Sequence, residues 1–245
     1  MKNFGFTLAE VLITLGIIGI VAAMTIPTLI SNTNCQKFKT GFKKNLSALN
    51  QMAKINSQKY DFDFASVKNC LNKDTDNPTT VNSICAIING NITGKFATKY
   101  QDIITKHGVP YYQDVFNKAT PDTMIKNQGV ELYMYKMLDG SIFMFHSPME
   151  GRSDDIACTL GGKTLAERLN ERQFQKYCIA FIDVNGAELP NKEVRCSDGK
   201  SHTTDINSEC IVPKNSAFMT DVYPIAIFDS TVAPASAAAK YVLGN

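Results

Sequence analysis

Residues 2–21 read KNFGFTLAEVLITLGIIGIV and begin an apolar stretch that extends to Ile30. No Asp, Glu, Lys or Arg lies between Glu10 and Lys37. A helix over residues 6–30 has a length of about 37 Å at ~1.5 Å per residue, enough to cross a hydrocarbon core of about 30 Å. A cleaved secretory signal has a shorter apolar core, of about 7–15 residues. The sequence therefore predicts a membrane-spanning helix over residues 6–30.

Glu10 is the one acidic residue of this stretch, and two explanations fit its position. An ionised carboxylate inside a bilayer is costly and marks a functional residue that needs a partner. Alternatively, Thr7 and Glu10 form a capping box, in which each side chain binds a free backbone N–H at the start of the helix. The same four letters, TLAE, recur at residues 164–167, where capping alone is a sufficient explanation. The tetrapeptide is therefore nonspecific, and its context has to distinguish the two copies.

The context of the first copy resembles the N-terminus of type IV prepilins and type II secretion pseudopilins. A short basic leader ends at Gly5, and Phe6, the TLAE tetrapeptide and the apolar run follow. The resemblance implies that a prepilin peptidase on the cytoplasmic face cleaves between Gly5 and Phe6, and that Phe6 is then N-methylated. It also implies that Glu10 attracts the N-terminal amine of a neighbouring subunit during assembly. The helix around Pro27 is implied to loosen when subunits pack, although a proline also kinks a helix without any such role.

The implied pairing is physically coherent. An unpaired carboxylate and an unpaired ammonium are both costly in a low-dielectric core, and each neutralises the other when they meet. We therefore expect a single-pass protein of the bacterial inner membrane, with its C-terminal part outside the cytoplasm, that assembles with itself or other pilins into a pilus or pseudopilus. The alternative is a signal-anchored periplasmic binding or enzymatic domain that never polymerises and keeps its N-terminus uncut and unmethylated.

Helical periodicity continues beyond the membrane span. An apolar stripe recurs every three or four residues, at Phe38, Phe42, Leu46, Leu49 and Ala53. It predicts one helix over residues 6–60 whose second half packs on the chain's own globular part, residues 61–245, with residues 1–5 as the leader. Four lysines follow the span and would place this side in the cytoplasm by the positive-inside rule, against the resemblance. We interpret them as a solvated face, with contact to lipid head groups as the second interpretation; they are Lys37, Lys39, Lys43 and Lys44.

The rest of the chain carries strand signals. Asp139 and Gly140 separate two β-rich runs, residues 130–138 and 141–146, and this pattern predicts a hairpin. Further strands are predicted over residues 179–184 and 223–228, a short helix over 235–243, and irregular structure over 61–128. The expected fold class is α+β: a long N-terminal helix packed on a C-terminal antiparallel sheet, which is the pilin-like layout.

Seven cysteines and three histidines show no zinc-site spacing. Widely spaced cysteines favour disulfides in an oxidising compartment, with buried free thiols as the alternative. Cys70 and Cys85 would close a loop of about fifteen residues, worth about 3 kcal/mol. The resemblance favours Cys196 with Cys210, because pilins often close a C-terminal loop in this way. Cys158 and Cys178 form the remaining pair and Cys35 is the odd thiol, although the sequence leaves the connectivity open.

Other function classes find little support. A net charge of +2 gives no indication of a nucleic-acid partner. No nucleophile-elbow or phosphate-loop motif is present, so we expect no enzyme, no cofactor and no metal. Asp183, Asn185, Glu188 and Asn191 could offer oxygen ligands to calcium, but their spacing does not complete an EF-hand loop. A turn that ends a strand is the simpler interpretation of this stretch.

Overall fold

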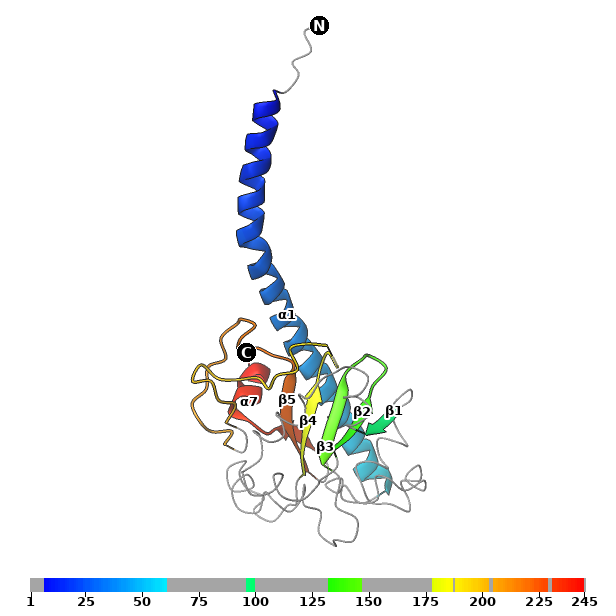
Figure 1. Cartoon of the computed structure of the whole chain (residues 1–245). Coiled ribbons are helices and arrows are strands. Elements are labelled where there is room, and N and C mark those ends of the chain that lie inside the picture. The colour runs from blue at the N-terminus through cyan, green and yellow to red at the C-terminus, as the bar shows by residue number, and fades with distance from the viewer. Residues whose placement is uncertain are drawn as a thin grey trace.

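The computed structural model describes seven parts of the chain: residues 7–60, 96–99, 132–146, 178–186, 188–202, 205–228 and 231–244. A long helix, α1 (Leu8–Tyr60), precedes a six-stranded antiparallel sheet and a short C-terminal helix, α7 (Ala237–Gly244). Figure 1 shows the first half of α1 projecting from the globular part and its second half lying across the sheet. The predicted α+β, pilin-like fold class is confirmed.

The helix α1 has 53 residues and is continuous through Pro27. At ~1.5 Å per residue its length is about 80 Å, of which a globular domain of this size can cover only a part. The helix changes direction between its projecting half and its docked half (Figure 1). A single element therefore connects the N-terminal segment to the sheet.

The sheet is a meander in which every strand pairs antiparallel with the next strand in sequence. The predicted hairpin is confirmed, with Lys136 opposite Ile142 across the turn at Gly140. The predicted strands at 179–184 and 223–228 are also present, each shifted by one residue, whereas β1 and β6 were not predicted. The strands are β1 (Phe96–Lys99), β2 (Leu132–Lys136), β3 (Ile142–His146), β4 (Cys178–Asp183), β5 (Val222–Ile227) and β6 (Val232–Pro234).

Two glycine turns meet at one end of the sheet. Gly140 and Gly186 have φ angles of 88° and 71°, a region that residues with a Cβ rarely adopt. A Cβ at Gly186 would also collide with the carbonyl oxygen of Gly140. The turn after β4 therefore packs against the β2–β3 turn only because Gly186 has no side chain.

The core lies between the docked half of α1 and one face of the sheet. All five residues of the predicted apolar stripe are buried, from Ala53 and Phe42 at 0% exposed to Leu46 at 8%. Phe42 stacks on Tyr223 of β5, with ring centroids 4.1 Å apart and an interplanar angle of 9°. The prediction that this stripe docks on the chain's own globular part is thus confirmed.

A polar contact also joins the docked half of α1 to the turn between β2 and β3. The Lys44 ammonium lies 2.8 Å from Asp139 Oδ2 in the β2–β3 turn. Asp139 Oδ1 accepts hydrogen bonds from the backbone N–H and the hydroxyl of Ser141. Burial opposes ionisation of Asp139, but these hydrogen bonds outweigh it and lower the pKa of Asp139. The contact connects α1 to the tip of the hairpin.

Candidate functional site: the N-terminal helix and its surroundings

The projecting half of α1 is apolar, and its large side chains are exposed from the rest of the described chain. Its large side chains range from 44% exposed at Val11 to 80% at Leu8, and Ile30 is still 55% exposed. This helix is long and apolar enough to cross a membrane, and none of its most apolar window is buried within the protein. An apolar surface of this size on a soluble chain would favour association, since burying one such side chain is worth about 1.5–3 kcal/mol. A bilayer covers it completely.

The start of α1 forms the capping box that the sequence offered as one explanation of Glu10. The Glu10 carboxylate oxygen Oε2 accepts hydrogen bonds from the backbone N–H and the hydroxyl of Thr7, both at 2.8 Å. In return the Thr7 hydroxyl oxygen accepts from the backbone N–H of Glu10 at 3.3 Å. In a single copy of the chain, Glu10 is therefore hydrogen-bonded within its own helix.

The other predicted residues of this segment are placed only in part. Gly5 and Phe6, the residues of the expected cleavage, lie outside the described residues. Pro27 lies inside α1, three residues before the end of the apolar run. Nearby, the Thr25 hydroxyl donates to the carbonyl oxygen of Val21 at 3.0 Å, a back-bonding pattern that is associated with bent helices. The pairing of Glu10 with a neighbouring subunit stays a prediction.

A disulfide closes the C-terminal loop favoured by the sequence. Cys196 and Cys210 are bonded, with Cα atoms 5.1 Å apart and a sequence separation of 14. Asp198 and His202 of this loop form a contact of 2.7 Å. Their ligand atoms lie within 4.8 Å of the Cys196 sulfur, but a disulfide sulfur is not the thiolate that binds metals.

The remaining cysteines are only partly described. Cys35 is a free thiol, 3% exposed, on the docked face of α1. Cys178 is in β4, but the described part of the chain does not show its side-chain partner. The predicted pairs Cys70–Cys85 and Cys158–Cys178 therefore stay predictions, because three cysteines lie outside the described residues: Cys70, Cys85 and Cys158.

The stretch considered for calcium forms a hydrogen-bonded turn after β4. Asn191 is buried and has a φ angle of 46°. Its side-chain amide lies 3.2 Å from Asp183 Oδ2, 2.9 Å from the carbonyl oxygen of Gly186 and 2.8 Å from that of Glu188. Because all three neighbours are acceptors, the amide nitrogen faces them. One amide thus connects both ends of the turn, as the simpler interpretation of the sequence requires.

Asp221 is a buried carboxylate that the sequence did not identify. Its two oxygens accept the backbone N–H groups of Asn191 and Lys192, at 2.7 and 2.8 Å. Burial raises the pKa of Asp221 to about 6, although both N–H groups favour the ionised form. Its backbone carbonyl accepts from Val184 at 3.0 Å, so Asp221 connects the turn after β4 to the start of β5. In the sequence, no pattern around an aspartate just before a strand distinguishes a buried carboxylate from a solvent-exposed one.

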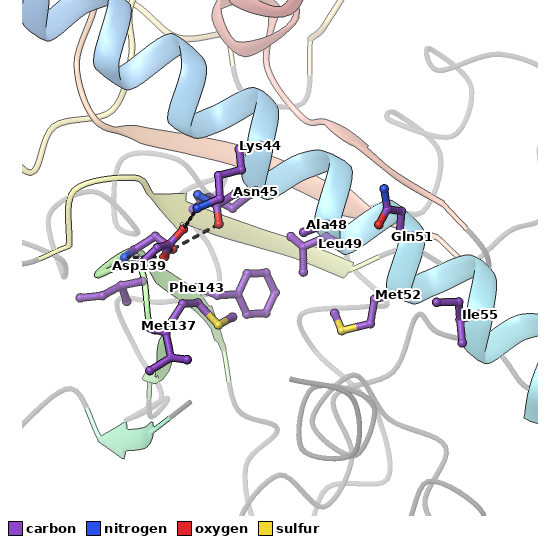
Figure 2. A pocket seen from close by; sticks show the side chains of 14 residues that line it. Lys44, Asn45, Ala48, Leu49, Gln51, Met52, Ile55, Met137, Asp139 and Phe143 are labelled. Atoms are coloured by element: carbon purple, nitrogen blue, oxygen red, sulfur yellow. Dashed lines mark hydrogen bonds and ion pairs between the residues drawn. The ribbon is translucent and has the colours of Figure 1, made fainter. Parts of the chain in front are cut away.

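A cavity of about 420 Å³ lies between α1 and the β2–β3 hairpin (Figure 2). Leu49, Met52 and Ile55 line it from the helix, and Met137 and Phe143 line it from the hairpin. Figure 2 shows Lys44, Asn45 and Asp139 at one end of the site, around the Lys44–Asp139 ion pair, and Gln51 further along the helix. That carboxylate is already shared between an ammonium and a hydroxyl, so it is not poised as a general base. The described lining is that of an apolar recess.

Comparisons with known proteins agree with the N-terminal assignment. Residues 1–26 match the family described as the prokaryotic N-terminal methylation motif. This is the type IV prepilin-like signature that the opening stretch predicted, and it includes Gly5, Phe6 and Glu10. No curated protein and no solved structure matches the chain. The methylation motif and the exposed apolar helix together fit a type IV pilin-like subunit that is anchored in a membrane.

Proposed function

We propose that this chain is a structural subunit of a type IV pilus or of a related secretion pseudopilus. In this proposal residues 1–5 are a leader, residues 6–60 form the helix with its membrane part at 6–30, and residues 61–245 form the globular domain outside the cytoplasm. A prepilin peptidase cuts after Gly5, and Phe6 is methylated on its new amine. The observation that carries the proposal is that the methylation motif, residues 1–26, overlaps the part of α1 whose large apolar side chains are exposed, from Leu8 to Ile30.

Glu10 has a specific role in this function. Inside the hydrocarbon region its charge is costly, and Thr7 compensates only part of that cost through two hydrogen bonds. The methylated amine of Phe6 in a neighbouring subunit carries the opposite charge. Pairing the two removes both penalties and fixes the axial position of one helix against the next.

The polymerised state also explains the shape of the subunit. A helix whose large side chains are exposed from Leu8 to Ile30 can pack against other helices without disturbing the core. The stripe from Phe38 to Ala53 keeps the globular part attached throughout. After assembly the apolar surface that lipid covered would be covered by the corresponding helices of other subunits.

The experiment that tests the proposal is mass spectrometry of the N-terminal peptide from cells that express the full chain. A peptide that begins at methylated Phe6 supports the subunit function. A peptide that begins at Met1, with no methyl group, would instead support a signal-anchored periplasmic domain, the alternative for which the apolar cavity beside α1 is the structural argument. Electron microscopy of sheared filaments, with immunological detection of the chain, separates a processed anchor from a polymer.

A further inference from the structure

The globular part contacts α1 immediately beyond its apolar half. The Ser31 hydroxyl oxygen accepts a hydrogen bond from the backbone N–H of Ser216 at 3.2 Å. Ser31 directly follows Ile30, the last residue of the apolar run. In a bilayer the head groups occupy roughly 5–7 Å on each side of the hydrocarbon core, so the segment that carries Ser216 lies at their level. Figure 1 shows the loops between β4 and β5 gathered at this end of the globular part.

The segment around Ser216 is a tight, internally bonded turn. The carbonyl oxygen of Asn215 accepts from the N–H of Met219 at 2.9 Å, and its side-chain oxygen accepts from the N–H of Ala217 at 3.0 Å. Met219, at 5% exposed, anchors the turn in the core. Lys214, by contrast, is exposed on the outside. The hydrogen bonds of this turn and the buried Met219 side chain therefore hold the backbone next to Lys214 in place.

Two lysines of α1 follow Ser31 along the helix, Lys39 about two turns and Lys43 about three turns further on, while Ser216, beside Lys214, contacts Ser31. Loss of hydration, and then the positive charges of Lys43 and Lys214, lower the pKa of Lys39. Side chains on a helix lean toward its N-terminus, so Lys39 and Lys43 lean toward the membrane end of α1. We call Lys39, Lys43 and Lys214 the basic exit patch.

No acidic group balances this patch within the described part of the chain. The helix α1 contains no Asp or Glu after Glu10. Lys44, on the other side of the helix, has its carboxylate partner in Asp139. Among the described residues, no carboxylate lies within ion-pair distance of Lys39, Lys43 or Lys214. Like charges held close together repel one another unless an anion comes between them.

We propose that the basic exit patch binds the anionic head groups of phospholipids in the leaflet from which α1 emerges. The phosphodiester groups supply the missing negative charge, at the depth at which the Ser31–Ser216 contact places Lys214. Attraction to an anionic surface reaches over a Debye length of about 8 Å at physiological salt, so Lys39 and Lys43 are drawn in as well. The inference rests on the membrane insertion in the proposed function, and it is independent of filament assembly.

The test is lysine reactivity in proteoliposomes that contain the full chain. Vesicles of phosphatidylcholine alone are compared with vesicles that contain one third phosphatidylglycerol. Amines are methylated with formaldehyde and dimethylamine–borane, because both reagents are uncharged and are not repelled by an anionic membrane. Peptide mass spectrometry then reports each lysine separately. We expect labelling of Lys39, Lys43 and Lys214 to be at least threefold slower in the anionic vesicles, and the difference to disappear in 1 M salt.

A matched lysine provides the control. Lys54 lies further along the helix, and its labelling should change by less than about 1.5-fold. In the Lys214→Gln variant the protection of Lys39 should fall by half or more, whereas Lys54→Gln should leave it unchanged. Equal labelling in both vesicle types would overturn the proposal, and so would protection that depends on protein density, which indicates contacts between copies. Failure of the chain to float with the vesicles would instead refute membrane anchoring, and with it the proposed function.

Discussion

The side chain of Asn50, in the middle of docked α1, binds both backbone groups of Val232 in β6. Its amide nitrogen donates to the Val232 carbonyl oxygen at 2.6 Å, and its amide oxygen accepts from the Val232 N–H at 2.8 Å. The strand β6 is at the edge of the sheet, where backbone groups otherwise stay open to pairing with another chain. One helical side chain thus replaces a neighbouring strand at this position.

Replacing Asn50 with Ala should lower the free energy of unfolding by about 2–4 kcal/mol, because the buried N–H and C=O of Val232 both lose their partner. Chemical denaturation of the full chain in detergent, followed by circular dichroism, measures the change. Gln51→Ala, at the next and exposed position of the helix, should stay within about 0.5 kcal/mol of the unmodified chain. Equal stability of the two variants would contradict the pairing.

Phe42→Ala should destabilise the protein by about 3–5 kcal/mol, since it removes a fully buried ring that stacks on Tyr223. Phe42→Leu keeps much of the volume and should cost about 1–2 kcal/mol. The same denaturation experiment ranks the variants. If the alanine variant were no less stable than the leucine variant, the stack could not be the main contact between α1 and the sheet.

The buried carboxyl group of Asp221 should make the free energy of unfolding depend on pH, and the sign of this dependence is definite. Its pKa is raised from 3.8 to about 6 on folding. Its favourable contribution to the free energy of unfolding is therefore complete below pH 4 and is lost as the pH rises through 6. The loss amounts to about 2–3 kcal/mol between pH 4 and pH 7. In Asp221→Asn this decline should be absent, and thermal unfolding across the pH range measures it.

Removing the Cys196–Cys210 disulfide should lower the free energy of unfolding by about 3 kcal/mol. This value follows from the loss of chain-entropy restriction for cysteines with a sequence separation of 14. The double variant Cys196→Ser and Cys210→Ser should therefore unfold at lower denaturant than the unmodified chain under oxidising conditions. Cys35→Ser is the comparison that changes a cysteine without removing a cross-link. A double variant that is as stable as the oxidised chain would show that the loop is held by its other contacts.

Glu10→Ala should abolish or strongly reduce filament yield while leaving the chain in the membrane. The apolar helix alone is sufficient for insertion, whereas the pairing with a neighbouring amine needs the carboxylate. Shearing of cells followed by immunoblotting measures the yield, and membrane fractionation measures insertion. Glu167→Ala, in the second TLAE tetrapeptide, is the matched control and should assemble normally. Normal assembly of the Glu10 variant would favour capping as the whole role of this residue.

The sequence was informative wherever a local pattern fixes the structure. The stripe from Phe38 to Ala53 and the Asp-Gly turn at 139–140 correctly predicted the docked face of α1 and the β2–β3 hairpin. The strand β6 was missed because it has only three residues and contains Pro234, which argues against a strand. The strand β1 was missed because it lies within a polar stretch that was predicted to be irregular.

The individual residue pairs that connect distant parts of the chain could not be predicted. Lys39 and Lys43 were recognised as a group, but Lys214 joins them only because a turn far along the chain packs against Ser31. In the sequence, Asn50 is an ordinary polar residue of a helix, and only the structure shows its contact with β6. For Glu10, the sequence supplied both explanations, and the structure of one chain shows the hydrogen bonds of the capping box.

The direction of the docked helix determines how the subunit bears mechanical load. Tension on the membrane-embedded half acts along the axis of α1 and reaches the globular part through contacts spread from Cys35 to Ala53. Such a force shears the Phe42 stack, the Lys44 ion pair and the Asn50 pairing at the same time, instead of peeling them apart one after another. The rupture force is therefore shared among them. A fibre built from such subunits would resist pulling better than the strength of any one contact suggests.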